Sequence, residues 1–237
     1  MKPRIADLYS NSGGAGRGYQ LAGFYVVGFD NKPQPRYAGD EFRQCDVLDI
    51  DPRWLAASFD AIHASPPCQG FTDLNNDKSR HLNLIPQTRA ILEASGLPYV
   101  IENVRRAREH LVDPVSLFGT MFDLHMVTSD GVRFDLSRER LFETNWGLEA
   151  PADFEAQHPI ANVFGGHLRA RSGDYRTGKG TGRTVDFPGE DRPALARQLM
   201  GMPWASMGEM SEAIPPAYCR FIGEQLMGEV DRRRSAA

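Results

Sequence analysis

The sequence has few of the features that mark membrane proteins, disulfide-stabilised proteins or metal-binding proteins. Its 237 residues include only three cysteines, Cys45, Cys68 and Cys219, which are too few and too scattered for a disulfide framework. No apolar run approaches the length of a membrane span, so we expect no membrane association. The six histidines and the cysteines show no paired ligand spacing, and no metal site is expected.

The chain also lacks an overall positive charge and a secretory leader. Its net charge is −4, so binding of a polyanion would have to use a local group of basic residues. The N-terminal segment has no apolar h-region, which predicts no secretory signal, and the scarce cysteines favour a reducing cytoplasm. With 41% hydrophobic residues, the chain supports one sizeable core with at most a small inserted subdomain.

Short apolar runs alternate with helix-like segments over the first 145 residues. Strands are expected at 4–9, 24–29, 42–45, 59–64 and 97–101, and a helix at 84–95. This alternation is typical of parallel βαβ units, so it predicts an α/β fold with a doubly wound, Rossmann-like sheet. We predict a catalytic and cofactor-binding domain at 1–145, to which the chain returns at 191–237 with a C-terminal helix.

Residues 146–190 are rich in glycine, proline and charge, and little in them could form a core. Between Gly165 and Thr184 only Leu168, Ala170 and Tyr175 could contribute. The segment therefore predicts a small inserted region or long functional loops, with a disordered surface loop as the alternative. Its basic residues, which could contact a polyanion, are Arg169, Arg171, Arg176, Lys179 and Arg183.

Two residues that could take part in catalysis follow the fourth and fifth predicted strands. Cys68 lies in a Ser-Pro-Pro-Cys-Gln segment directly after the fourth strand, and Glu102 follows the fifth. Open α/β sheets place their chemistry in a crevice at the carboxyl ends of the strands. A lone cysteine is most often a small buried hydrophobe and a lone glutamate is most often solvated, but the pairing favours a nucleophile and an acid in one site.

The first three strand ends favour a nucleoside-containing cofactor. Gly13 and Gly14 lie in a turn after the first strand, where backbone N–H groups can approach the polar end of a ligand. Asp30, at the end of the second strand, suits two ribose hydroxyls, and Asp46, after the third, could accept a hydrogen bond from an adenine amino group. Strands one to three are therefore predicted to bind an adenosine-containing cofactor.

Five segments, taken in order, resemble the motif series of cytosine-C5 DNA methyltransferases. They are Asp7-Leu-Tyr-Ser-Asn-Ser-Gly-Gly14, Pro66-Pro-Cys-Gln69, Glu102-Asn-Val104, Arg138-Glu-Arg140 and Glu212-Ala-Ile-Pro-Pro216. The resemblance spans 4–145 and 193–227 and is to small members of the family from bacteria and phages. It implies S-adenosyl-L-methionine as the methyl donor, double-stranded DNA as the substrate, a monomer, and a cytoplasmic location in a bacterial or phage-infected host cell. Restriction protection, phage self-protection and regulation are all compatible with it.

The resemblance implies roles for five catalytic residues. Cys68 would add to carbon 6 of cytosine, while Glu102 would protonate or hydrogen-bond ring nitrogen 3. Arg138 and Arg140 would fix the base carbonyl, Glu102 and the backbone phosphates. Asn103 would position the Cys68 loop. A base inside a duplex cannot reach these groups, so the mechanism implies that the base is flipped out of the stack.

The resemblance also implies which residues bind the cofactor and the DNA. Residues 146–190 would form a reduced target-recognition region, within which 163–183 would supply DNA contacts. The DNA-binding residues would be Arg169, Arg171, Arg176, Lys179 and Arg183. The cofactor-binding residues would be Tyr9, Ser10, Asn11, Gly13, Gly14, Asp30, Asn31, Asp46, Val47, Pro66 and Ala213.

Three features depart from the family pattern. Asn11 stands where many members have glycine and Glu212 where asparagine is common, both near the amino-acid end of the predicted donor. Only about 45 residues (146–190) remain for target recognition, which favours short target sequences or help from a partner. Two alternatives stay open: the same chemistry on RNA or a free cytosine nucleotide, and a catalytically silent DNA-binding member.

Overall fold

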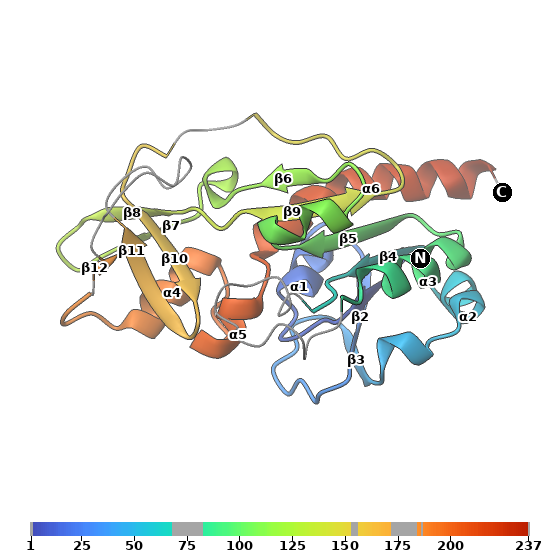
Figure 1. Cartoon of the computed structure of the whole chain (residues 1–237), viewed down its shortest axis with the longest axis horizontal. Coiled ribbons are helices and arrows are strands. Elements are labelled where there is room, and N and C mark those ends of the chain that lie inside the picture. The colour runs from blue at the N-terminus through green and yellow to red at the C-terminus, as the bar shows by residue number, and fades with distance from the viewer. Residues whose placement is uncertain (1, 68–82, 153–155, 172–183, 186, 237) are drawn as a thin grey trace.

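The computed structural model describes residues 2–67, 83–152, 156–171, 184–185 and 187–236. Its strands form a seven-stranded and a five-stranded sheet, which lie side by side along the long axis of the molecule (Figure 1). The larger, central sheet contains β1 (Arg4–Leu8), β2 (Tyr25–Asp30), β3 (Glu41–Gln44), β4 (Ala61–Ala64), β5 (Tyr99–Asn103), β6 (Val115–Leu117) and β9 (Arg140–Thr144). The second sheet contains β7 (His125–Val127), β8 (Arg133–Leu136), β10 (Ile160–Phe164), β11 (His167–Arg171) and β12 (Thr184–Val185).

The central sheet has the order β3-β2-β1-β4-β5-β9-β6. Strands β1 to β5 run parallel, while β9 is antiparallel to both β5 and β6. Crossovers between these strands include α1 (Gly14–Leu21), α2 (Pro52–Ser58) and α3 (Ile85–Ser95). The predicted α/β class with a Rossmann-like sheet is confirmed.

Helices cover both faces of the central sheet, because neighbouring residues of each buried strand point to opposite sides. Ile5 and Val26 pack with residues of α1 and of the C-terminal helix α6 (Pro216–Ala236). The adjacent residues Ala6 and Val27 pack on the other face with residues of α2 and α3. The near-continuous apolar runs that predicted these strands are thus explained by burial on two faces.

The second sheet has the order β12-β11-β10-β8-β7 and is covered by α4 (Arg192–Met200) and α5 (Met207–Glu212). The antiparallel hairpin of β10 and β11 was not predicted from the sequence. It buries Val163, Leu168 and Ala170 in a third core with residues of both helices. Two of the five strands, β7 and β8, precede residue 146, so the sheet is wider than the segment predicted as an insert. The boundary at 145/146 stays a prediction.

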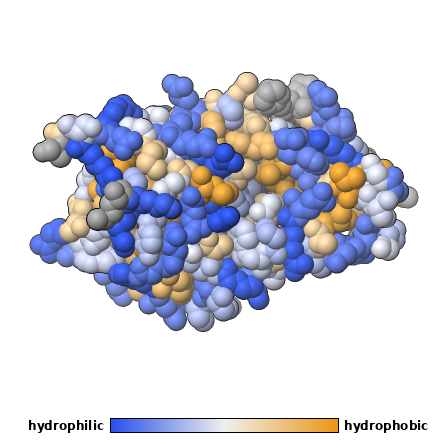
Figure 2. Space-filling model, turned by 180° about the vertical axis from the view of Figure 1, so that it is seen from behind, coloured by the Kyte–Doolittle hydropathy of each residue, from blue (hydrophilic) through white to orange (hydrophobic). Residues whose placement is uncertain are grey.

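Three short 3-10 helices complete the described chain: η1 (Val47–Asp49), η3 (Arg105–His110) and η4 (Gly119–Phe122). On the face seen in Figure 2, hydrophobic residues gather in patches that hydrophilic residues separate. No helix in the described part of the chain combines the length and apolar character needed to cross a membrane.

Candidate active site

The carboxyl ends of the parallel strands meet at one edge of the central sheet. Leu8 of β1 pairs with Phe29 of β2 and with Ala64 of β4. Ala64 pairs in turn with Ile101 of β5, so the next residue of each strand lies at the same level. The polar residues at this edge include Ser10, Asp30, Ser65 and Glu102. Residues of both predicted half-sites therefore meet at this edge of the sheet.

Glu102 is a buried carboxyl group at the end of β5. Only 6% of it is exposed, and its Oε1 lies 2.9 Å from Nε of Arg140. Burial raises the pKa of Glu102 above its ordinary value, although the charges of Arg140 and Arg138 and a hydrogen bond from Ser65 oppose that rise. A carboxyl group in this environment holds its proton to a higher pH than an exposed glutamate, which is the property that a general acid needs.

Asn103, the last residue of β5, is bonded to the segment that leads into Cys68. Its Nδ2 donates to the carbonyl of Pro66 at 2.9 Å, and its Oδ1 accepts from the N–H of Val104 at 2.9 Å. The side chain is thus fixed at both ends and holds the chain two residues before Cys68. Cys68 itself lies outside the described residues, and its predicted role stays a prediction.

The three arginines of the Arg133–Arg140 stretch have three different environments. Arg140 pairs with Glu102, whereas Arg133 pairs with Asp123 and Asp135. The buried Arg138 guanidinium donates at 2.6–3.0 Å to the backbone carbonyls of Val163, Met210, Ser211 and Ala213. These contacts place Arg138 at the junction of the second sheet with the end of α5. Its charge also acts on the nearby Glu102, opposing the rise in the pKa of that carboxyl group. The predicted roles of Arg138 and Arg140 at the base carbonyl stay predictions.

The glycine-rich turn after β1 has an unusual backbone. Tyr9 and Asn11 have φ values of 59° and 45°, in the left-handed region that asparagine tolerates better than most residues. This conformation explains why glycine would also suit position 11. Gly14 is required for a different reason, because a Cβ there would lie 2.2 Å from the carbonyl oxygen of Ile214. The chain after α5 therefore packs directly against the start of α1.

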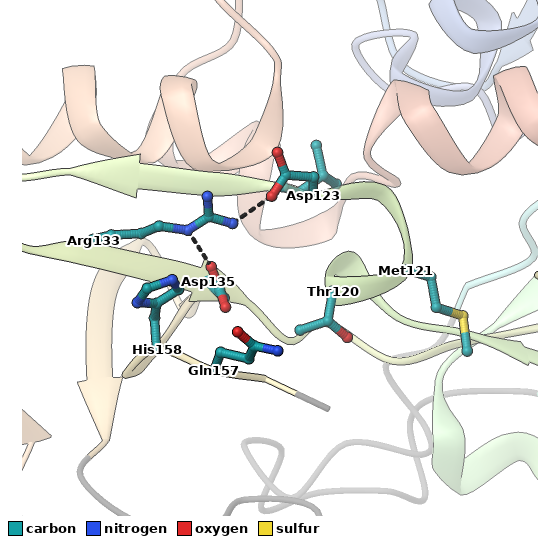
Figure 3. Close-up of a pocket in the computed structure, with 8 residues that line it drawn as sticks. Thr120, Met121, Asp123, Arg133, Asp135, Gln157 and His158 are labelled. Atoms are coloured by element: carbon teal, nitrogen blue, oxygen red, sulfur yellow. Dashed lines mark hydrogen bonds and ion pairs between the residues drawn. The ribbon is translucent and has the colours of Figure 1, made fainter. Parts of the chain in front are cut away.

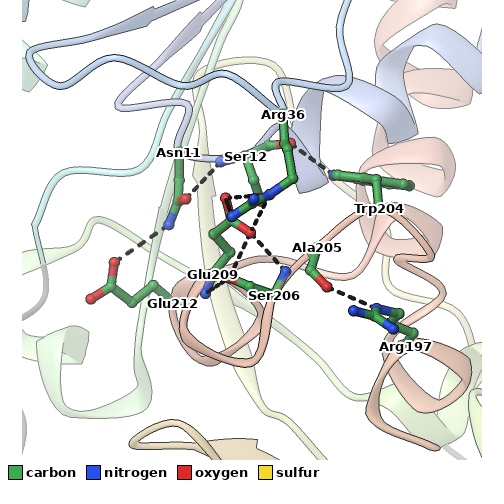
Figure 4. Close-up of polar contacts among 9 residues, drawn as sticks. All are labelled: Asn11, Ser12, Arg36, Arg197, Trp204, Ala205, Ser206, Glu209 and Glu212. Carbon is green, nitrogen blue, oxygen red and sulfur yellow. Dashed lines mark hydrogen bonds and ion pairs between the residues drawn. The ribbon is translucent and has the colours of Figure 1, made fainter. Parts of the chain in front are cut away.

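Polar contacts fix this turn to the segment around α5 (Figure 4). Trp204 Nε1 donates to the carbonyl of Ser12 at 2.9 Å. Arg36, in the loop between β2 and β3, forms a forked pair with Glu209 at 3.0–3.2 Å. Because Glu209 also closes the capping box of α5 with Ser206, one carboxylate joins the helix start to the loop. Sequence reasoning missed Arg36, Trp204 and Glu209, which carry no motif.

The two departures from the family pattern contact each other. Asn11 Nδ2 donates to Glu212 Oε2 at 3.4 Å, and Figure 4 shows the amide directed at the carboxylate. Asn11 Oδ1 in turn accepts from the N–H of Ser12 at 2.6 Å. The exposed Glu212 thus stands beside the glycine-rich turn.

The residues at this turn fit the polar end of a ligand such as S-adenosyl-L-methionine. The hydroxyl oxygens of Ser10 and Ser12 are buried and have no hydrogen-bond partner within the described chain. Buried hydroxyls without partners are costly, and a polar ligand group could satisfy them. Asp30 lies beside them, with Oδ2 accepting from the N–H of Asn11 at 3.1 Å, and each carboxylate oxygen can accept further bonds.

The other residues predicted to bind the cofactor lie along the same edge but differ in exposure. Asn31 and Asp46 are exposed, and Asp46 caps η1 by accepting from the N–H of Leu48. The buried residues of the set are Gly13, Val47, Pro66 and Ala213. Tyr9 is half-buried, with its hydroxyl 2.9 Å from Thr88 Oγ1. Their roles in cofactor binding stay predictions.

Beneath the turn lies a buried carboxyl group that sequence reasoning left unassigned. Asp7 of β1 accepts a hydrogen bond from the Tyr37 hydroxyl at 3.2 Å and another from the N–H of Gly16. Burial raises the pKa of Asp7 to about 8, against these two bonds. A Cβ on Gly28 would lie only 2.3 Å from the ring of Tyr37, so this glycine leaves the space that the ring occupies. Tyr37 thus packs the loop between β2 and β3 against β2.

A hollow of about 570 Å³ lies at the β10–β11 turn, between this hairpin and the starts of α4 and α5. Basic residues that line it are His167, Arg169 and Arg192. Arg169 stacks on the ring of Phe164, with 5.0 Å from Cζ to the ring centroid, so one predicted DNA-binding residue is held on a defined surface. Arg171 ends β11, and Arg176, Lys179 and Arg183 lie outside the described residues.

A second hollow, of about 390 Å³, separates η4 from the second sheet (Figure 3). Arg133 reaches across it, and its guanidinium is bonded to Asp123 and Asp135. Two carboxylates thus offset its charge. Figure 3 shows His158 and Gln157 beside Asp135. No group of three or more potential ligands could hold a metal ion within the described residues.

Comparison with known proteins identifies the fold but not a family by sequence. No protein-family model matches the chain, and no curated protein matches its sequence. Among solved structures, a DNA modification methyltransferase encoded within an E. coli prophage is similar over 97% of this chain and 100% of its own, with 14% identity and a TM-score of 0.60. The S. pombe Dnmt2 methyltransferase and the Entamoeba histolytica methyltransferase EhMeth cover 97% of this chain and 99% of their own, with TM-scores of 0.57 and 0.59.

The sequence identity is 15% to the S. pombe protein and 11% to the Entamoeba protein. At such identities, all three similarities show a shared fold only. The overlap is nearly complete in both directions, so the second sheet is part of the match and not an addition to it. The chain therefore has the fold of these methyltransferases, which is the fold that the motif resemblance implies.

Proposed function

We propose that the protein transfers the methyl group of S-adenosyl-L-methionine to carbon 5 of cytosine in DNA. The observation that carries the proposal is the buried Glu102–Arg140 pair at the strand-end edge. It lies next to the Asn103–Pro66 bond that fixes the approach to Cys68. An acid, a cation that orients it and a cysteine, which here follows the adjacent strand β4 by four residues in the sequence, are the groups that methylation at this carbon requires.

The chemistry explains the need for each group. Carbon 5 of cytosine is a poor nucleophile until a thiolate, here that of Cys68, adds to carbon 6 and interrupts the aromatic ring. Negative charge then develops at ring nitrogen 3, and the Glu102 carboxyl donates its proton there. The bound cofactor supplies an electrophilic methyl group, which carbon 5 takes up. The proton on ring nitrogen 3 returns to Glu102 as carbon 5 takes up the methyl group. Loss of the carbon 5 proton and breaking of the sulfur–carbon 6 bond then release 5-methylcytosine and the Cys68 thiolate.

The environment of Glu102 supports its part in this sequence. Burial favours the protonated form before the reaction, and the Arg140 guanidinium stabilises the carboxylate after the proton has left. Arg140 Nη1 is itself fixed by the carbonyl of Glu139 at 2.9 Å. The acid therefore keeps one orientation in both protonation states.

The donor would be held by the turn and the strand ends next to it. Asp30 would accept from the ribose hydroxyls, and the buried hydroxyls of Ser10 and Ser12 would pair with polar groups of the donor's amino-acid end. Glu212, held by Asn11, would face the ammonium group of that end. These residues and the Glu102 site share one edge of the sheet, as transfer between two bound molecules requires.

DNA would lie along the basic surfaces on either side of this edge. Arg105 and Arg108 of η3 flank Glu139 at 3.6 and 3.8 Å and are exposed. On the second sheet, the hollow at the β10–β11 turn offers Arg169 and its neighbours to phosphates or base edges. Both surfaces carry local positive charge on a chain whose net charge is negative.

Covalent trapping tests the proposal. A duplex containing 5-fluorocytosine blocks the final proton loss, so incubation with S-adenosyl-L-methionine should yield an adduct that survives denaturation and maps to Cys68 by peptide mass spectrometry. Cys68→Ser is the matched control and should give none. An RNA with 5-fluorocytidine and the free nucleotide form parallel arms. An adduct on either of these but not on DNA would show that the substrate is RNA or the free nucleotide and not DNA. No adduct in any arm would overturn the proposal.

A further inference from the structure

Behind Glu102, a row of hydrogen-bonded side chains runs into the core of the central sheet. The Ser65 hydroxyl, which bonds to the Glu102 carboxyl group, lies 2.9 Å from Nε2 of His63. Nδ1 of His63 lies 3.0 Å from the hydroxyl of Tyr19 on α1. Helix α1, strand β4 and the loop after β4 thus supply a continuous row of hydrogen-bonding groups that leads to Glu102. The sequence motifs assigned a role to none of these three residues.

His63 is the central member of the row and is neutral. It is fully buried on β4, and burial lowers its pKa to about 3. A neutral imidazole carries one N–H, so one ring nitrogen must donate and the other must accept. The ring also lies 5.3 Å from the ring of Tyr19, which restricts its rotation.

The direction of the row follows from the carboxylate at its end. In the state that follows proton donation Glu102 is ionised and can only accept, so in that state the single hydrogen of the Ser65 hydroxyl points toward it. The Ser65 oxygen is then the acceptor for Nε2–H of His63. Nδ1 is left as an acceptor, which the Tyr19 hydroxyl satisfies. With Glu102 ionised, this arrangement gives the hydrogens of Ser65, His63 and Tyr19 one acceptor each within the row.

We propose that Ser65 and His63 are positioning residues for Glu102: the neutral ring orients the Ser65 hydroxyl, which fixes the carboxyl group and stabilises its ionised form. This inference rests on the proposed function for its chemical meaning, because Glu102 is the acid of that reaction. Sequence position alone gives no indication of it, since His63 reads as one residue of a buried strand.

The groups around Glu102 allow its titration to be observed separately. The positive charges that act on it are those of Arg140 and Arg138. On α6, burial first and then the charges of Asp7 and Glu102 raise the pKa of Cys219 well above its ordinary value, so this thiol stays protonated. Asp7 is a second buried carboxyl group of this region, with its pKa raised to about 8, and it acts on both Tyr19 and Cys219. The Glu102 titration is therefore identified by the signal that is lost in Glu102→Gln.

Carbon-13 NMR of the glutamate carboxyl groups tests the electrostatic part without any substrate. The Glu102 signal, assigned by its loss in Glu102→Gln, should titrate at a higher pH in Ser65→Ala than in the wild type. Ser65→Thr, which keeps the hydroxyl, should restore the wild-type value. Ser95→Ala is the matched control, because it also removes a buried serine hydroxyl, one bonded to the Leu92 carbonyl. An unchanged Glu102 titration in a folded Ser65→Ala variant would overturn the proposal.

Nitrogen-15 NMR of the histidine ring tests the direction of the row. At a pH where the carbon-13 signal shows Glu102 to be ionised, we expect the Nε2–H form of His63, and we expect no imidazolium down to about pH 4. If Nδ1 carries the proton instead, the Ser65 hydroxyl must donate to His63 and cannot orient toward Glu102. That result contradicts the proposal, whatever reaction the protein catalyses.

Kinetics separate this proposal from the proposed function. Ser65→Ala should lower kcat for methyl transfer about tenfold, the effect of removing one hydrogen bond to a charged group, with KM for DNA unchanged. In a Glu102→Gln background, Ser65→Ala should add no further loss. If Ser65→Ala costs the same factor in both backgrounds, it does not act through Glu102. If Glu102→Gln itself keeps the wild-type rate, the proposed function fails, and the two NMR measurements still decide whether the row exists.

Discussion

The two sheets use their buried polar residues differently. In the central sheet, buried carboxyl groups lie at the carboxyl ends of the parallel strands, with pKa values raised by burial. In the second sheet, the buried Arg138 is bonded to backbone carbonyls and Arg133 to two carboxylates, so charge is offset within the fold. Under the proposed function, the reaction would take place at the edge of the central sheet, and the second sheet would provide shape and exposed basic residues.

Two buried glutamates of the central sheet give the sharpest test of this division. Glu102→Gln should lower the rate of methyl transfer by two decades or more, because the proton donor to the base is removed. Its free energy of unfolding should fall less than that of Glu143→Gln, because burial already disfavours the ionised form of Glu102 and offsets part of the loss of the Arg140 pair. Single-turnover rates and urea unfolding measure the two effects. A Glu102→Gln enzyme with a near wild-type rate would contradict the assignment.

Glu143 is the matched control, because it is also buried, lies on neighbouring β9 and pairs with an arginine. Arg89 Nη2 lies 2.6 Å from its Oε2, and the N–H of Val112 donates to the same oxygen at 2.8 Å. Glu143→Gln should lower the free energy of unfolding by roughly 3–5 kcal/mol, as expected when one partner of a buried ion pair is removed. The folded fraction should keep most of its activity. Equal effects of the two substitutions on activity would contradict the distinction between Glu102 as the acid and Glu143 as a structural residue.

Asp7 makes the stability of the central sheet depend on pH. Its pKa is about 8 in the folded protein against an ordinary value of 3.8, so the folded state binds the proton more tightly. The stability that this provides is complete below pH 3.8 and is lost as the pH rises through 8. The loss should reach about 1.4 kcal/mol per pH unit. Asp7→Asn should flatten this part of the pH profile of urea unfolding, and a profile with the wild-type slope would contradict the assigned cause.

Asp30 should matter for the cofactor and not for DNA. Asp30→Ala removes an acceptor for two hydroxyls, and affinity for S-adenosyl-L-methionine by calorimetry should fall about tenfold or more. Asp49→Ala, which removes an exposed carboxylate from η1, serves as the control and should bind as the wild type does. Unchanged affinity in Asp30→Ala would show that Asp30, at the end of β2, does not bind the cofactor.

The basic residues of the second sheet should show the reverse pattern. Replacing Arg169, Arg171 and Arg176 together with alanine should weaken DNA binding and lower the slope of log K against log salt by roughly one unit for each phosphate that is no longer bound. Cofactor affinity should be unchanged. A variant with Arg53, Arg220 and Arg232 replaced has the same change in net charge on exposed helical positions. If both variants bind DNA equally well, the DNA-binding surface lies elsewhere, with 105–135 the next candidate.

The sequence predicted the central sheet better than the second sheet for a physical reason. Strands buried on both faces are continuous apolar runs, and the last apolar residue of a run marks the end of its strand. Asp30 and Glu102 could therefore be placed at one edge of the sheet. The β10–β11 hairpin is buried on one face only, and the pattern His167-Leu-Arg-Ala-Arg171 alternates as such a strand should. The surrounding glycines and charges obscured this alternation, which was the available signal.

Side-chain partners were the least predictable part of the site. Arg138 lies two residues from Arg140, yet it bonds to carbonyls of α5 more than seventy residues later in the chain. The Asn11–Glu212 contact also joins the first turn to the last motif. Such pairings depend on how the second sheet and α5 close over the central sheet, which spacing along the chain does not specify.

The most direct test of the central claim is the chemical identity of the methylated nucleoside. Duplex DNA is incubated with the protein and isotope-labelled S-adenosyl-L-methionine, digested to nucleosides and resolved by liquid chromatography with mass spectrometry. The Glu102–Arg140 site predicts label in 5-methyldeoxycytidine, absent with Cys68→Ser and strongly reduced with Glu102→Gln. Label in N4-methyldeoxycytidine or N6-methyldeoxyadenosine, or unlabelled DNA from an active preparation that binds the cofactor, would contradict it.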